Sequence, residues 1–289
     1  MMNEQSSHVS VRPQKVVHDR TRLKLCVFLV LAAALIGVAV FAEAFCPYPP
    51  DQQNLSMSLR RPSLAHPLGT DRYGRDMLSR VIAGAKTSVL ATLALVAIVS
   101  AAGTVTGVIC GYLGGAVDSF LMRLSDVCLA FPGLVFALAI AAVFRGGVEN
   151  AVLALAAISW PKYSRVARGQ TLVVKNMEYV AAARMAGSST LSIIFRHVLP
   201  NIAGPLLVAA TLDIGTMMME LAGLSFLGLG AQPPTPEWGS MMSTGRSMLQ
   251  TYPWVVLSPG AAIFVTVVLF NLLGDAVRDA MDPRQRRSR

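Results

Sequence analysis

The sequence NMEYVAAARMAGSSTLSIIFRHVLP (residues 176–200) lies between long apolar runs, yet it carries several ionisable side chains. These side chains are Glu178, Arg184, Arg196 and His197. Asn176 is suited to cap a first helix, with Glu178 in its positive first turn, and Gly187 is suited to the left-handed position that ends a helix. The stretch therefore predicts a helical hairpin.

The second half of this hairpin is expected to form a short helix of its own. One of the hydroxyl residues 188–190 can cap it, and an apolar stripe follows at helical spacing: Leu191, Ile194, Phe195 and Val198. Pro200 suits the first turn of the next long helix. The first helix presents a smooth face of small residues, Ala181, Ala182 and Ala183. A hairpin between membrane spans can be a plain connector, but this face predicts a docking surface for a partner.

The composition indicates a polytopic membrane protein. Of 289 residues, 54% are hydrophobic and only 14% are charged, and the mean hydropathy is +0.54. The net charge is +9, and no nucleic-acid-binding motif accompanies it. We therefore expect the basic residues to mark the cytoplasmic ends of membrane helices and to contact anionic lipids. The four cysteines are scattered and form no CxxC pair, so we expect packing residues and no metal site.

We expect an all-α fold with six transmembrane helices. The apolar segments are residues 25–42, 89–112, 127–144, 151–160, 202–224 and 255–273. They make residues 25–278 a transmembrane domain, between a polar tail at 1–24 and a basic tail at 279–289. A cleaved signal peptide is the alternative for the first segment, but the long polar leader and the lack of a small-residue cleavage site favour a retained span.

The distribution of basic residues predicts the orientation in the membrane. Six spans place both termini on one side, and that side carries 17 of the 25 Lys and Arg residues, against 8 on the other. The positive-inside rule therefore assigns both termini and the hairpin at 176–200 to the cytoplasm.

Two further patterns concern helix packing and loops. Four glycines recur every four residues and predict a ridge on one helix face that lets a second helix approach closely: Gly103, Gly107, Gly111 and Gly115. In the loop that follows, Asp118, Arg123 and Asp126 are expected to be structural ion-pair partners. In the segment HPLGTDRYGRDMLSR (66–80), the aspartates are expected to cap a helix or pair with arginines, and a role in substrate binding is the less favoured alternative.

Two carboxylates fall within the fifth apolar segment. Asp213 and Glu220 are seven residues apart, on one helical face with Met217 between them. A carboxylate at bilayer depth costs at least about 2.5–3.5 kcal/mol, so it should face a bundle interior or a water-filled path. We expect these three residues to line a translocation path, with hydrogen bonds to a neighbouring helix as the alternative. Carboxylate and thioether groups also suit a cationic or metal-containing cargo, although no firm metal site is predicted.

The chain lacks the motifs of an enzyme. GAKTS (84–88) has no Gly-Lys pair and fails the phosphate-loop pattern, and the four histidines form no cluster. If ATP drives this protein, another subunit must bind it. An ion-coupled secondary transporter that works alone, through Asp213 and Glu220, is the alternative from another class.

The hairpin resembles the cytoplasmic EAA loop of ABC importer permeases. The three alanines at 181–183 stand at the EAA positions, Gly187 at the glycine, and the sequence from His197 to Pro200 at the end of the loop. Ala181 replaces the usual glutamate, and Glu178 lies one turn earlier. By this resemblance, the residues that couple to an ATPase are Glu178, Ala181, Ala182, Ala183, Gly187, Arg196 and His197.

Further segments resemble the second permease subunit of the dipeptide/oligopeptide/nickel family. They are HPLGTDRYGRD (66–76), GYLGGAVDSFLMRLSD (111–126), RHVLPN (196–201), LSFLGLGAQPPTPEWG (224–239) and NLLGDAVRDAMDP (271–283). The resemblance implies the type I importer permease fold in a bacterial inner membrane. It also implies a homologous second permease, two ATPase subunits that bind ATP and Mg, and an extracytoplasmic solute-binding protein. TLDIGTMMMELAG (211–223) is closer to nickel members, so nickel is the favoured cargo and a peptide is the alternative.

Overall fold

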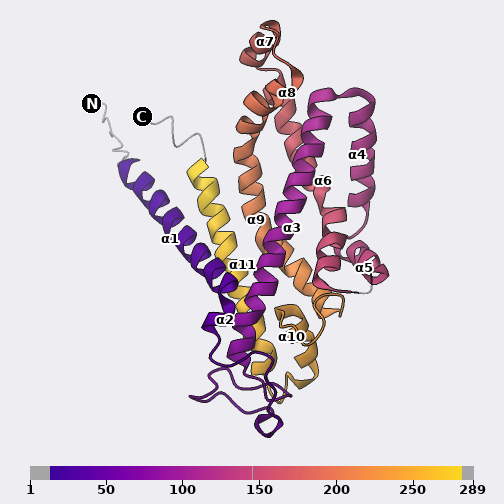
Figure 1. The fold of residues 1–289 in the computed structure, drawn as a ribbon. Coiled ribbons are helices and arrows are strands. Elements are labelled where there is room, and N and C mark those ends of the chain that lie inside the picture. The colour runs from indigo at the N-terminus through magenta and orange to yellow at the C-terminus, as the bar shows by residue number, and fades with distance from the viewer. Residues whose placement is uncertain (1–13, 145, 282–289) are drawn as a thin grey trace, which may run out of the picture.

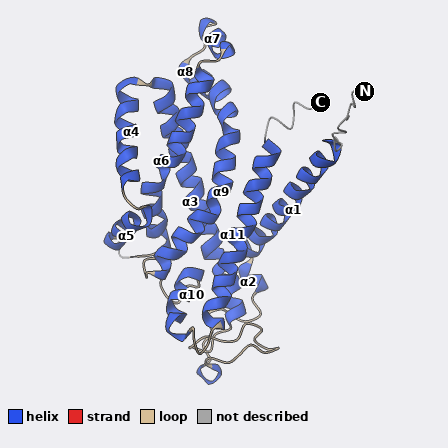
Figure 2. Ribbon diagram, turned by 180° about the vertical axis from the view of Figure 1, so that it is seen from behind, coloured by secondary structure: helices blue, strands red, loops and turns tan. Residues whose placement is uncertain are grey.

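The computed structural model describes residues 14–281 except residue 145, and within that range the chain is helical, without a β-strand (Figures 1 and 2). The α-helices are α1 (Gln14–Val40), α2 (Ala42–Phe45), α3 (Met77–Leu113), α4 (Gly115–Ala130), α5 (Gly133–Val143), α6 (Val148–Lys175), α7 (Glu178–Met185), α8 (Thr190–Ile193), α9 (Leu199–Phe226), α10 (Trp238–Gly245) and α11 (Trp254–Met281). Short 3-10 turns lie at Leu55–Met57 and Arg246–Met248, and a π-helical segment lies at Ile194–Val198. Most of the tail at 1–24 and of the tail at 279–289 lies outside the described residues.

Helices α3 and α6 lie side by side and form the centre of the bundle (Figure 1). Three glycines of α3 make this approach possible, because a Cβ at Gly103, Gly107 or Gly111 would lie 2.3–2.9 Å from backbone or Cβ atoms of α6. The predicted ridge is thus confirmed for these three. It is wrong for Gly115, because α3 ends at Leu113 and Gly115 has φ +60° with no atom near its Cβ direction.

The membrane spans differ from the prediction in three places. Four helices are long and apolar enough to cross a membrane, namely those at Arg22–Val40, Met77–Leu113, Thr190–Phe226 and Trp254–Met281. The predicted third span is instead two helices, α4 and α5, bent by 93° and counted as a fifth span if taken together. The second span begins at Met77, twelve residues before the predicted start at 89. The fourth lies within the 28-residue helix α6, which carries four basic residues and is not among these four apolar helices.

A proline explains the bend between α4 and α5. Phe131 ends α4 in an extended conformation and Pro132 precedes α5. A residue before proline is sterically driven away from the helical region, and proline has no N–H to continue the ladder. Pro132 falls near the start of the span predicted at 127–144, and in the structure it separates two helices.

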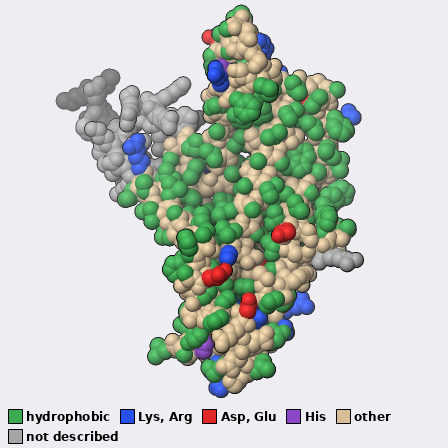
Figure 3. All heavy atoms as spheres, in the orientation of Figure 1, with side chains coloured by type: hydrophobic (Ala, Val, Ile, Leu, Met, Phe, Trp, Pro, Cys, Tyr) green, Lys and Arg blue, Asp and Glu red, His purple; other side chains and the backbone are tan. Residues whose placement is uncertain are grey.

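The bundle has two distinct ends. In Figure 1, α7 and α8 lie at the upper end, together with the first turn of α1 and the last turn of α11, while the loops at 46–76 and α10 lie at the lower end. Hydrophobic side chains cover most of the face between these ends (Figure 3). The first turn of α1 and the last turn of α11 therefore lie on the same side of the molecule as the hairpin.

Candidate functional site: the hairpin and the membrane carboxylates

Helix α7 begins one residue later than the capping pattern predicted. Its N-cap is Met177, which makes no side-chain cap. Asn176 instead ends α6, and its side-chain amide donates to the Leu172 carbonyl at 3.0 Å. The cap assignment was wrong because an asparagine suits both the end of one helix and the start of the next. Glu178 does lie in the first turn of α7, as predicted.

The end of α7 is the glycine motif that the sequence predicted. Gly187 has φ +82°. Its N–H donates to the Arg184 carbonyl, and the Ser188 N–H donates to the Ala183 carbonyl, both at 3.1 Å. This pair of hydrogen bonds is the Schellman arrangement, which satisfies carbonyls that a helix end leaves free. Ser189 then caps α8 by accepting a hydrogen bond from the Ser192 N–H.

The second half of the hairpin is not a separate helix. Helix α8 passes through the π-helical segment directly into α9, so that Thr190–Phe226 is one continuous helix. The predicted apolar stripe is also only partly right. Val198 is buried, together with Ile193, but Leu191 and Phe195 are 67% and 65% exposed. The π turn has more residues than an α-helical turn, so side chains before and after it do not share the helix face that α-helical spacing predicts.

The hairpin is anchored by a few buried side chains and exposes the rest. Val180, Ile193 and Val198 are at most 1% exposed and belong to the main hydrophobic core. The predicted coupling residues are exposed at Glu178, Ala181, Ala182, Gly187 and Arg196, and partly exposed at Ala183 and His197. Met185, at 84% exposure, joins Leu191 and Phe195 in a set of uncovered apolar side chains. The arrangement is a fixed projection with a small-residue and apolar surface.

Ion pairs hold α4 against α6 below the hairpin. Asp118 accepts two hydrogen bonds from Arg168, both at 2.6 Å, and Asp126 accepts one from Arg165 at 2.6 Å. These pairs confirm the structural role predicted for the two aspartates. For Arg123, no ion pair is found within residues 14–281.

The carboxylate of Asp213 is held by α6. It lies 2.5 Å from the Lys162 ammonium, and it accepts a hydrogen bond from the Tyr163 hydroxyl at 2.9 Å. The alternative of a hydrogen bond to a neighbouring helix therefore holds for this residue. Sequence reasoning missed both partners, although a lysine following an apolar run was a usable signal for a buried ion pair.

The other two residues of the predicted path differ from Asp213 and from each other. Met217 is 1% exposed and packs in the core of the chain, and its place on a translocation path stays a prediction. Glu220 is half-buried, and among the described residues its carboxylate has no hydrogen-bond or ion-pair partner.

The cysteines lie apart from one another in the bundle. All four cysteines are free thiols. Over the part of the chain that the structure describes, no group of three His, Cys, Asp or Glu side chains could hold a metal ion.

The fold resembles that of ABC importer membrane subunits. A chain of the MetNI methionine ABC transporter, solved in inward-facing conformations, aligns with a TM-score of 0.53 at 19% identity, covering 71% of this chain and 98% of that one. A second crystal form of the same transporter gives a TM-score of 0.52 at 18% identity, covering 67% and 94%. At this identity the likeness concerns the fold, which is that of a type I importer permease.

The chain belongs to the family of binding-protein-dependent transport system inner membrane components, whose model matches residues 103–287. It is similar to the glutathione transport system permease protein GsiD of Escherichia coli O6:K15:H31, with 44% identity over 86% of this chain and 83% of that protein. It is also similar to the probable D,D-dipeptide transport system permease protein DdpC of Escherichia coli K12, with 41% identity over 98% of both chains.

This family membership defines the general role of the chain. It is a multi-pass inner-membrane permease subunit of an ABC importer and not an enzyme, since separate ATPase subunits hydrolyse ATP in such systems. The preference for nickel drawn from residues 211–223 finds no support in these relatives. Their names fit the peptide alternative instead.

Proposed function

We propose that this chain forms one half of the translocation path of an ATP-driven importer for short peptides. A homologous second permease would supply the other half, and two ATPase subunits, which bind ATP and Mg, would dock at the hairpin end. A solute-binding protein would deliver cargo at the opposite end. The proposal rests on the family membership and on the hairpin, which is anchored in the core and yet exposes an apolar surface.

The hairpin is suited to transmit movement. Val180 and Val198 fix it to the core, and α8 continues without a break into α9. A force applied to α7 would therefore reach a membrane-spanning helix directly, and the bundle is the two-state element that it biases. The orientation follows from this role, because ATP is cytoplasmic: the hairpin and both termini face the cytoplasm.

The missing EAA glutamate has a structural counterpart. Ala181 and Glu178 are both exposed and lie three residues apart on α7. Residues at that spacing are neighbours on a helix surface. Glu178, one helical turn before Ala181, can therefore present its carboxylate to a docked subunit. The small side chain of Ala181 does not block access to that carboxylate.

The membrane carboxylates have separate roles in this proposal. Asp213 keeps α6 and α9 together through Lys162, and Glu220, which has no partner among the described residues, lines the path where the second permease completes it. A free carboxylate there would attract the ammonium end of a peptide, and burial would strengthen the attraction.

The decisive experiment is uptake into cells with and without this subunit. A labelled dipeptide, labelled glutathione and labelled nickel are compared in parallel. We expect loss of peptide or glutathione uptake in the deletion strain and no change for nickel. Loss of nickel uptake alone would overturn the peptide assignment while leaving the importer intact.

A further inference from the structure

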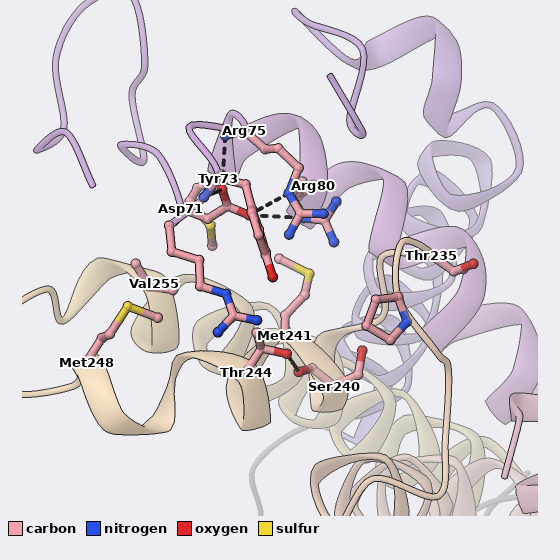
Figure 4. A pocket seen from close by; sticks show the side chains of 13 residues that line it. Asp71, Tyr73, Arg75, Arg80, Thr235, Ser240, Met241, Thr244, Met248 and Val255 are labelled. Atoms are coloured by element: carbon pink, nitrogen blue, oxygen red, sulfur yellow. Dashed lines mark hydrogen bonds and ion pairs between the residues drawn. The ribbon is translucent and has the colours of Figure 1, made fainter. Parts of the chain in front are cut away.

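The end of the bundle opposite the hairpin contains a small cationic cleft. One wall is the segment at 66–80, and the other is α10 with the loop before it (Figure 4). The cleft has a volume of about 60 Å³. Sites for drug-sized ligands are typically about 300–1,000 Å³, so this cleft accommodates a group the size of one carboxylate and not a whole peptide.

The arginine wall of the cleft is built rigidly. Asp71 accepts hydrogen bonds from the Arg75 side chain at 2.6 Å and from its backbone N–H at 2.9 Å. Arg80 donates to the Pro234 carbonyl at 3.3 Å, which ties this wall to the loop before α10. Gly74 allows the tight turn, since its φ is +72° and a Cβ there would lie 1.7 Å from the Asn54 carbonyl oxygen.

Tyr73 positions a second, unpaired arginine at the cleft. The guanidinium groups of Arg72 and Arg75 each lie 4.7 Å from the centre of its ring. Arg75 is buried and paired, whereas Arg72 is exposed and makes no ion pair with any described residue. Stacking on an aromatic ring orders a long side chain and leaves its N–H groups free to donate.

Every carboxylate of residues 43–80 and 225–254 already has a partner. Glu43 binds Lys86, which holds the pKa of that carboxyl below its usual value. Asp51 binds Arg80, and Asp71 binds Arg75. Asp76 caps α3 and contacts His66, while Glu237 caps α10. The acidic side chains at this end are thus used internally.

The cations outnumber these acids. Four arginines of the same segments are exposed and have no ion-pair partner within residues 14–281: Arg60, Arg61, Arg72 and Arg246. Of these, Arg72 alone lines the cleft. The opposite wall includes Thr235, Ser240 and Thr244. The hydroxyls of Ser240 and Thr244 donate to the backbone carbonyls of Glu237 and Ser240, so the charge of Arg72 is what this cleft offers an anion.

We propose that this cleft receives a carboxylate side chain of the solute-binding protein, with Arg72 as the residue that pairs with it. The inference rests on the proposed function, which places that protein at this end of the molecule. Charge complementarity at such a contact governs how fast and in which orientation two proteins associate. A partner docked there would contact the 66–80 segment, which includes the first turn of α3. It would also contact α10, which packs on α9 and α11.

The test uses the full complex in nanodiscs of neutral phosphatidylcholine, with the cognate solute-binding protein loaded with its peptide. Arg72→Glu is compared with wild type and with Arg61→Glu, a charge reversal of an exposed arginine that lies outside the cleft. We expect Arg72→Glu to weaken binding of the solute-binding protein by about tenfold or more, and Arg61→Glu to have little effect. Arg72→Lys should fall between wild type and Arg72→Glu.

Salt dependence separates a charge contact from a folding defect. Wild-type affinity should fall with added salt, whereas the affinity of Arg72→Glu should change less or rise. Copurification of the ATPase subunits with Arg72→Glu verifies that the variant complex is assembled. Wild-type affinity for Arg72→Glu, or an equal loss with Arg61→Glu, would overturn the inference.

Two further outcomes identify other errors. If the substitution has an effect only in nanodiscs that contain anionic lipid, the cleft binds a headgroup and the protein contact is wrong. If the solute-binding protein fails to bind the wild-type complex or to stimulate its ATPase, the proposed function itself fails. Normal stimulation of wild type with no effect of Arg72→Glu would refute the cleft and leave the proposed function standing.

Discussion

The close packing of α3 on α6 predicts that adding one methyl group at Gly107 destabilises the bundle. A Cβ at this position would lie 2.3 Å from the Ser164 carbonyl oxygen and 2.7 Å from the Ala167 Cβ. Neither atom is the end of a flexible side chain, so the helices must move apart. Gly169, on α6, is a matched control, because a Cβ there has no atom within 4 Å.

The magnitude follows from two opposing terms. Alanine is favoured over glycine within a helix by about 1 kcal/mol. Overpacking costs about 1–3 kcal/mol, and contact with backbone places Gly107→Ala near the upper value. The net expectation is a loss of about 2 kcal/mol for Gly107→Ala, or about thirtyfold in the folding equilibrium. Gly169→Ala should be neutral or stabilised by up to about 1 kcal/mol.

The assay is reversible unfolding of the purified subunit in mixed micelles, followed by tryptophan fluorescence. Gly103→Ala is a second test on the same face, because its Cβ would lie 2.5 Å from the Trp160 carbonyl oxygen. Equal stability of Gly107→Ala and Gly169→Ala would refute the assignment of the glycine face as the contact between α3 and α6.

Three other predictions concern single contacts. Asp213→Asn keeps a partner for Tyr163 but leaves Lys162 without its counter-charge. We expect slower peptide uptake with normal copurification of the ATPases, and unchanged uptake would show that the ion pair between α6 and α9 is not needed for transport. Asp118→Asn weakens the ion pair with Arg168. Because both side chains are partly exposed, we expect the pair to contribute about 1 kcal/mol or less to stability. This contribution is measured as the coupling energy in a double-mutant cycle with Arg168→Gln. Gly187→Glu forces a bulky residue into φ +82° on the hairpin surface; ATP hydrolysis should continue while uptake falls, whereas normal transport would count against docking there.

Much of the hairpin could be predicted from sequence because its signals are local. Gly187 ends α7 as expected, since few other residues adopt a positive φ without strain. Glu178 falls in the first turn for the same local reason. The errors arose where two local explanations competed, as at Asn176, which ends one helix and precedes another. The π turn at Ile194–Val198 has no comparable sequence signal, so the facing of Leu191 and Phe195 could not be predicted.

The long-range contacts were harder to predict. The carboxylate of Asp213 was recognised as costly in a membrane, but its partners Lys162 and Tyr163 lie about fifty residues away in sequence. The glycine ridge was correct for three positions and wrong at Gly115, because periodicity alone does not reveal where a helix ends. The cleft at Arg72 was also missed, since it requires residues of 66–80 and 233–255 to meet.

The central claim is that the hairpin docks an ATPase subunit, and site-specific crosslinking tests it most directly. A photo-crosslinking residue is placed at Ala182, an exposed residue of α7, and as a control at Leu64, an exposed residue of the segment at 46–76. That segment lies at the opposite end of the bundle (Figure 1). The products are identified by mass spectrometry after irradiation of intact cells. The account predicts a crosslink from position 182 to an ABC ATPase subunit and none from position 64. A crosslink to the ATPase from position 64, or its absence at 182 in cells that import peptide normally, would contradict it.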